Sequence, residues 1–135
     1  MVDPVPALVA AARAVAERAH APYSGFRVGA AVLGAAVHVG ANVENASYGL
    51  GLCAERSALS RAVAEGDTDL RAIAVACVDA RPDSPLAELM PCGACRQWFA
   101  ELAPKADIHI AGVDGRVHRF GLEDLLPHAF ELRRG

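Results

Sequence analysis

Two cysteine-containing segments, about forty residues apart, each stand at the predicted start of a helix. The first is "CAERSAL", in which Cys53 follows the glycine-rich "YGLGL", and the second is "PCGACRQ", in which Cys92 and Cys95 form a C-x-x-C pair. The positive end of a helix dipole lowers the pKa of nearby thiols and favours thiolates. A fold that brings the two helix starts together could therefore hold one metal ion with three thiolates.

The number of cysteines favours an open zinc site. A structural zinc site uses four protein ligands, whereas a site with three protein ligands leaves one position for water. The remaining thiol, Cys77, lies inside the apolar run "AIAVACVDA", where a packing role is expected. No histidine lies at a ligand spacing from the cysteines; the five are His20, His38, His109, His118 and His128.

Composition excludes several classes of partner. A formal net charge of −3 at pH 7, with scattered Lys and Arg, gives no field that would attract nucleic acid. The N-terminal segment has Asp3 and two prolines where a signal peptide would carry positive charge, and no apolar run approaches the ~20 residues of a membrane span. We therefore expect a cytoplasmic protein with reduced thiols, no membrane partner and a single domain over residues 1–135.

Periodicity and turn residues predict a three-layer α-β-α fold of the α/β class with a five-stranded mixed sheet. Strands are expected in 27–34 and 35–43, which form a hairpin, in 70–78 at the centre of the sheet, and on both sides of the Asp-Gly turn within 106–120. Helices are expected over 5–19, 54–64 and 92–103, with a short helical turn in 122–130 and a loop over 79–91. The predicted apolar stripe of the second helix consists of Ala58, Leu59, Ala62 and Val63, and Gly66 ends that helix.

Glu55 stands two residues after Cys53, so the two side chains do not share a helix face. Its carboxylate could approach the open metal position without competing with the thiolate, and could take a proton from a metal-bound water. The alternative is that Glu55 only stabilises the positive end of its helix, a contribution of about 0.3–1 kcal/mol.

Together with "PYSGFRVGAA", "NVENASYGLGLCAERSAL" and "EDLLPHAF", these motifs resemble the small, homotetrameric, three-cysteine zinc cytidine deaminases over residues 22–130. The resemblance implies that Cys53, Cys92 and Cys95 bind one Zn²⁺ per subunit and that Glu55 is the catalytic proton shuttle. It implies hydrolytic deamination of cytidine and 2′-deoxycytidine to the uridines with release of ammonia, in which zinc-bound hydroxide attacks C4. Such a reaction serves pyrimidine salvage.

The resemblance also implies a substrate site that subunits of a homotetramer share. Asn42 and Glu44 match the residues that hold the 3′-hydroxyl of the sugar, and Phe26 with Val28 match those beside the ring. Residues matched to contacts across subunits are Ala46, Tyr48 and Phe130, and Ala54 joins the substrate-binding set. A carboxylate beside the 3′-oxygen would repel phosphate, so a free nucleoside is the expected substrate.

Arg56 matches an arginine that hydrogen-bonds the sulfurs of the zinc ligands. Three thiolates leave Zn²⁺ with a net charge of about −1, and a nearby cation would withdraw part of that charge. The alternative is a salt bridge on the helix surface. The chain departs from the family pattern in a shorter first hairpin, "VLGAAVHVG", and in Ser47 with "YGLGL".

Three other functions fit parts of the pattern. Blasticidin S deaminases also carry C-A-E and P-C-G-x-C-R-Q, although the intact "NVENASY" favours cytidine. In a non-catalytic binding module stabilised by zinc, Glu55 would only stabilise its own helix. A redox role for Cys92 and Cys95 would give no function to Cys53 or Glu55.

Overall fold

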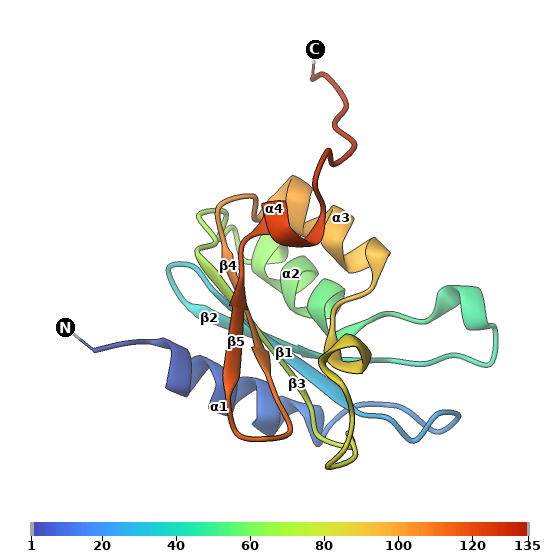
Figure 1. The fold of residues 1–135 in the computed structure, drawn as a ribbon. Coiled ribbons are helices and arrows are strands. Elements are labelled where there is room, and N and C mark those ends of the chain that lie inside the picture. Colours follow the sequence, from blue (N-terminus) through green and yellow to red (C-terminus); the bar gives the residue numbers. More distant parts are fainter. Residues whose placement is uncertain (1, 135) are drawn as a thin grey trace.

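The computed structural model describes residues 2–134, and its elements follow the predicted order along the chain (Figure 1). They are α1 (Val5–Ala16), β1 (Val28–Leu33), β2 (Val37–Ala41), the 3₁₀ turn η1 (Tyr48–Leu50), α2 (Ala54–Ala64), β3 (Ala72–Cys77), the 3₁₀ turn η2 (Leu86–Leu89), α3 (Gly93–Leu102), β4 (Asp107–Ala111), β5 (Val117–Phe120) and α4 (Leu122–Leu125).

The sheet has five strands in the order β2-β1-β3-β4-β5. Only the β3–β4 pair is parallel, and the other three pairs are antiparallel, so the predicted mixed sheet is confirmed. β3 lies at the centre and is buried along nearly its whole length, because helices cover both faces of the sheet there. This is the environment that its continuous apolar sequence predicted.

Helices on opposite faces give the three predicted layers (Figure 1). Leu8 and Ala12 of α1 pack against Ala31 and Ala74 on one face. On the other face, α2 and α3 build the larger core around Leu59 and Phe99, which are fully buried.

Two strand glycines let the helices approach the sheet closely. A Cβ at Gly29 would overlap the carbonyl oxygen of Ala12 in α1, and one at Gly40 would overlap the backbone nitrogen of Ala58 in α2. Both helices therefore pack directly against the backbone of the strands. For α2, this contact fixes the position of the helix N-terminus relative to the sheet.

The β1–β2 hairpin is confirmed, and its turn is held from outside. Asp67, in the loop after α2, accepts hydrogen bonds from the amides of Ala35 and Ala36, each at 3.1 Å. Its carboxylate also contacts Nε2 of His38 at 2.7 Å. A distant carboxylate thus supplies the turn stabilisation that an Asn-Gly or Asp-Gly pair would have supplied locally.

Three local predictions need correction. α1 ends at Ala16 rather than at residue 19, since the chain turns there to reach β1. Val63 is 48% exposed and lies outside the buried stripe of Ala58, Leu59 and Ala62. The predicted loop 79–91 contains the turn η2, which buries Leu89 in the larger core.

An arm of residues 42–52 leaves the sheet after β2, carries η1 at its outer end and returns to the start of α2 (Figure 1). Paired backbone hydrogen bonds between Val43 and Leu52 close its base. Within residues 2–134, none of the helices combines the length and the apolar character needed to cross a membrane.

Candidate metal centre and active site

Three cysteines from two helix starts meet at one point. Cys53 is the N-cap residue of α2, Cys92 is the N-cap residue of α3, and Cys95 lies in the first turn of α3. The Sγ atoms of Cys53 and Cys92 are 3.7 Å apart, and those of Cys92 and Cys95 are 3.5 Å apart. Among the described residues, the His, Cys, Asp and Glu side chains that lie close enough together to bind one metal ion are these three cysteines.

The donor set fits zinc. Tetrahedral Zn²⁺ with Zn–S bonds of about 2.3 Å places two ligand sulfurs about 3.8 Å apart. The sulfur separations of 3.5 and 3.7 Å lie close to that value. Three soft thiolates at two positive helix ends suit this ion and leave one of its four positions open.

The environment of Cys53 favours its thiolate form. Its pKa is lowered to about 5, first because Cys95 hydrogen-bonds to its sulfur and then because Arg56 does so as well. Nη2 of Arg56 donates to Sγ of Cys53 at 3.4 Å, and the same contact raises the pKa of the guanidinium. The cation beside the sulfurs therefore comes from the same helix turn as the first cysteine.

Glu55 points into the protein. It is 4% exposed, and burial raises the pKa of its carboxyl to about 7. The thiolate of Cys53 contributes to this rise, and Cys95 and Arg56 partly offset it. A carboxyl in such a place can hold a proton or release it near neutral pH, as a proton carrier requires.

Cys77 stays outside the cluster, as the sequence predicted. It ends β3, packs against the larger core and donates a weak hydrogen bond from Sγ to the carbonyl oxygen of Leu89 at 4.0 Å. Burial raises the pKa of its thiol to about 12, so it remains a neutral thiol. The structure places no histidine with the three sulfurs among the described residues, and His38 is buried between the carboxylates of Asp67 and Glu65.

Two of the predicted sugar-binding residues hold the segment 23–28 that leads into β1. Asn42 accepts a hydrogen bond from the amide of Val28 at 2.8 Å and donates one to the carbonyl oxygen of Phe26 at 2.9 Å. Glu44 accepts hydrogen bonds from the backbone of Tyr23 and from Ser24. Phe26, Val28, Asn42 and Glu44 thus form one connected group.

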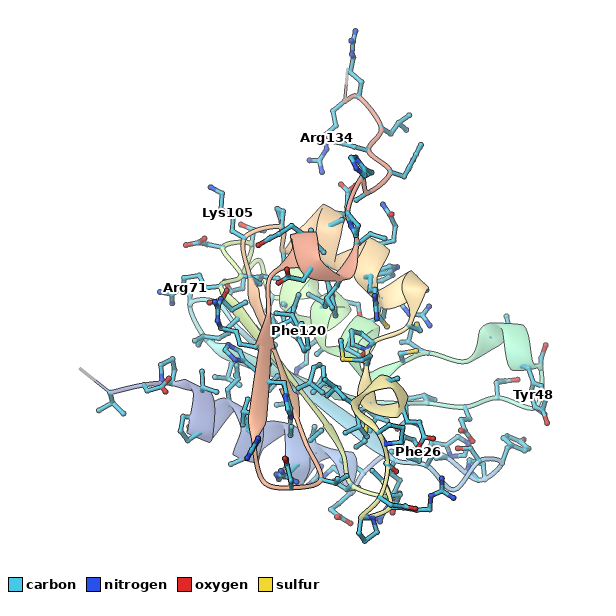
Figure 2. All side chains as sticks on the ribbon, viewed as in Figure 1. Phe26, Tyr48, Arg71, Lys105, Phe120 and Arg134 are labelled. Carbon is cyan, nitrogen blue, oxygen red and sulfur yellow. The ribbon has the colours of Figure 1, made fainter. Side chains whose placement is uncertain are left out.

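The other predicted substrate residues lie on three different segments. Ala54, the first residue of α2, is fully buried. Ala46 and Tyr48 belong to the arm, and Figure 2 shows Tyr48 at its outer end. Phe130, which is 71% exposed, lies beyond α4 on the C-terminal segment.

Two residues of "PCGACRQ" have structural partners that the sequence reading missed. Arg96 donates to the carbonyl oxygens of Pro91 at 2.9 Å and Leu125 at 2.7 Å, which ties the residue before Cys92 to α4. Gln97 donates to the carbonyl oxygen of Phe130 at 2.9 Å. Backbone oxygens carry no side-chain signal, so these long-range contacts could not be read from spacing.

The chain resembles known proteins over nearly its whole length. Residues 5–110 match the family described as the cytidine and deoxycytidylate deaminase zinc-binding region. A cytidine deaminase from Halalkalibacterium halodurans is 47% identical over 117 residues, with 84% of each chain covered. One from Mycobacterium tuberculosis is 43% identical over 116 residues, which are 84% of this chain and 80% of the relative.

Solved structures agree with these relatives. The crystal structure of cytidine deaminase from Burkholderia pseudomallei superposes with a TM-score of 0.83 at 44% identity, covering 96% of this chain and 100% of that one. The structure of the enzyme from Mycobacterium tuberculosis gives a TM-score of 0.76 at 38% identity, covering 98% and 100%. Fold and sequence therefore indicate the same group of proteins.

Proposed function

The chain belongs to the zinc-binding family of cytidine and deoxycytidylate deaminases, and we propose that it deaminates cytidine and 2′-deoxycytidine hydrolytically to uridine and 2′-deoxyuridine. The observation that carries this proposal is the convergence of three cysteine sulfurs beside one buried carboxyl, that of Glu55. Ammonia is the second product. The reaction would serve pyrimidine salvage in the cytoplasm, with residues 1–135 acting as one domain.

In this proposal Cys53, Cys92 and Cys95 hold one Zn²⁺ per chain. The ion, when bound, supplies a Lewis acid that turns a water molecule into a nucleophile at neutral pH. Arg56 hydrogen-bonds Cys53 and withdraws negative charge from the thiolate set. Without that cation, three thiolates would make the site a weaker electrophile.

Glu55 moves the protons. The carboxylate takes a proton from the attacking water and delivers it to N3 of the cytosine ring. Glu55 then takes the second proton from the hydroxyl that the water has left on C4 and gives it to N4, the C4–N4 bond breaks with release of ammonia, and C4 keeps the oxygen as a carbonyl. Burial of Glu55 supports this role, because a carboxyl shielded from solvent keeps the transferred proton inside the site.

In this proposal, residues from segment 26–28, from the arm and from the start of α2 hold the nucleoside. Phe26 and Val28 flank the pyrimidine, Ala54 contributes at the start of α2, and Asn42 and Glu44 hold the 3′-hydroxyl. The carboxylate of Glu44 disfavours a phosphate at that position, so nucleosides are preferred to nucleotides. The connected hydrogen bonds of Asn42 and Glu44 support this grouping.

We further propose a homotetramer with composite sites, in which Ala46, Tyr48 and Phe130 reach the substrate of a neighbouring subunit. Tyr48 is 82% exposed, and its arm stands away from the body of the chain, which is an unfavourable place for a large aromatic ring in water (Figure 2). A second copy would cover it.

The substitution Glu55→Gln tests the catalytic assignment. We expect the variant to keep about one zinc per chain and to lose at least ~100-fold in kcat, because the amide cannot carry protons. Zinc content and the ultraviolet absorbance change from cytidine to uridine are measured on the same purified sample. Glu123→Gln, an exposed residue at the start of α4, is the matched control and should keep full turnover.

Two outcomes would contradict the proposal. Undiminished turnover by Glu55→Gln would end the assignment of this carboxyl. A wild-type protein that turns over blasticidin S with a higher kcat/KM than cytidine would move the substrate class to that antibiotic.

A further inference from the structure

The segment before β1 is tied to Glu44 by a cluster of hydrogen bonds. One oxygen of the Glu44 carboxylate accepts from the amides of Tyr23 and Ser24, each at 3.1 Å, and the other accepts from the hydroxyl of Ser24. A carboxylate has about four acceptor positions, so three hydrogen bonds to the segment leave one free for a ligand hydroxyl. Glu44 can thus bind the segment and a sugar at the same time.

Ser24 connects this carboxylate to the next aromatic residue. Its hydroxyl donates to Glu44 and accepts a hydrogen bond from the amide of Phe26 at 3.0 Å, so both of its functions are used. Gly25 lies between them with φ of +68°, a left-handed conformation that turns the Phe26 amide back toward Ser24. Glu44, Ser24 and Phe26 therefore form a continuous relay.

The electrostatics keep the relay in one protonation state. The pKa of Glu44 is held below its ordinary value, chiefly by the hydroxyl of Ser24 and then by the Ser24 amide. The group remains a carboxylate at neutral pH, and hydrogen bonds to an ionised acceptor are stronger than those between neutral groups. Ser24 consequently has one stable orientation, with its proton toward Glu44 and its lone pair toward Phe26.

We propose that Ser24 is a positioning residue that couples sugar recognition at Glu44 to the placement of Phe26 against the base. This inference rests on the proposed function, in which Glu44 holds the 3′-hydroxyl and Phe26 flanks the pyrimidine. A 3′-hydroxyl that orders the Glu44 carboxylate also orders Ser24 and, through it, the backbone of Phe26. The 3′-hydroxyl of the sugar thereby contributes to turnover of the base. A free base and a 3′-deoxynucleoside lack this hydroxyl and therefore lack its full contribution.

Kinetics of Ser24→Ala with two substrates test the coupling. With cytidine we expect kcat/KM to fall by about 10-fold or more, because a charge-assisted hydrogen bond is lost and the Phe26 amide loses its acceptor. With 3′-deoxycytidine, where the coupling is already broken, the fall should be less than about 3-fold. Ser24→Thr retains the hydroxyl and should restore most of the activity on cytidine.

Hydrogen exchange gives a readout that does not depend on activity. In the absence of substrate, amide exchange of a peptide covering residues 22–28 should be faster in Ser24→Ala than in the wild type and close to the wild type in Ser24→Thr. Ser60→Ala is the matched control, since Ser60 is an exposed serine whose hydroxyl donates to the carbonyl oxygen of Ser57 in its own helix. It should change neither measurement.

Three results would overturn the inference: unchanged exchange in residues 22–28, an equal loss of kcat/KM on both substrates, or no loss on cytidine. These are distinct from a failure of the proposed function, which would appear as a wild-type protein with zinc but without turnover of cytidine. Thermal unfolding of each variant shows that the comparison is made on folded protein.

Discussion

Cys53, Glu55 and Arg56 lie within one helical turn, yet each meets a different environment. The Cys53 sulfur lies between the other two cysteines and the guanidinium of Arg56, whereas Glu55 is directed into the core. The helix makes this division possible, since Cys53 and Glu55, two positions apart, face different directions, whereas Cys53 and Arg56, three positions apart, are neighbours on one face. In the proposed mechanism, one short segment thus supplies a metal ligand, a buried proton carrier and a compensating cation.

At the residue scale, Cys77 and Cys92 provide a matched pair. Cys92→Ala removes one of three converging sulfurs, so zinc measured after desalting should fall from about one per chain to nearly none. Cys77→Ala removes a thiol that packs at the end of β3 and should keep the metal. Equal zinc contents in the two variants would show that the metal site lies elsewhere.

At the scale of elements, contacts in the middle of α2 and at both of its ends decide where this helix lies. Gly40 lets its middle rest on β2, and Cys53 at its N-terminus faces the start of α3. After its C-terminus, Asp67 reaches back to the turn of the β1–β2 hairpin and to the buried His38. The same helix therefore links the hairpin to the metal centre.

Asp67 makes the stability of this hairpin connection depend on acid. Its hydrogen bond with His38, followed by those from Ala35 and Ala36, lowers its pKa to about 2 from an ordinary 3.8. Because the folded protein binds this proton less readily than the unfolded chain, the stabilisation is complete above about pH 4 and disappears as pH falls toward 2. We expect Asp67→Asn to be less stable than the wild type at pH 7, with the difference shrinking below about pH 4.

Urea unfolding at a series of pH values, followed by circular dichroism, measures that difference. Loss of metal in acid affects both proteins and cancels in the comparison. Asp69→Asn, in the same loop, is the control and lacks these hydrogen bonds in the described structure. A difference between wild type and Asp67→Asn that stays constant down to pH 2 would contradict the assignment.

At the scale of the whole molecule, one chain leaves several large apolar side chains in water. Tyr48 and Leu50 occupy the arm, and Phe130 and Leu132 occupy the C-terminal segment; all four are at least 71% exposed. The arm and this segment extend away from the layers in Figure 1. Self-association is the arrangement that would bury these surfaces with the residues already present.

The double substitution Tyr48→Ser and Leu50→Ser tests the tetramer. Light scattering should give four chains for the wild type and a smaller assembly for the variant, with a parallel loss of cytidine turnover, because the arm would no longer bury apolar area against a neighbour. Val2→Ser changes a residue that is 89% exposed at the opposite end of the chain and should leave the assembly intact. A fully active wild-type monomer would exclude shared sites.

Much of the architecture was predictable because its signals are local. The apolar run through Ala74 predicted a central strand, Gly66 predicted the end of α2, and the Asp-Gly pair at 114–115 predicted the β4–β5 turn. Two helix starts with cysteines predicted a shared metal site, and the sulfur separations agree with it. Where the prediction erred, at Val63 and at the end of α1, packing against the rest of the chain overrode periodicity.

The sequence by itself therefore determined the order of the elements, the three-thiolate donor set and the identity of the candidate proton carrier, since residue type and short spacing carry that information. Tertiary structure alone decided that Asp67 supports a hairpin turn far from it in the sequence, that Arg96 holds the backbone of α4 and Gln97 that of the C-terminal segment, and that Ser24 links Glu44 to Phe26. These contacts end on backbone groups or join distant segments. Backbone amides and carbonyls are the same at every non-proline residue, so only the folded chain specifies which of them each side chain meets.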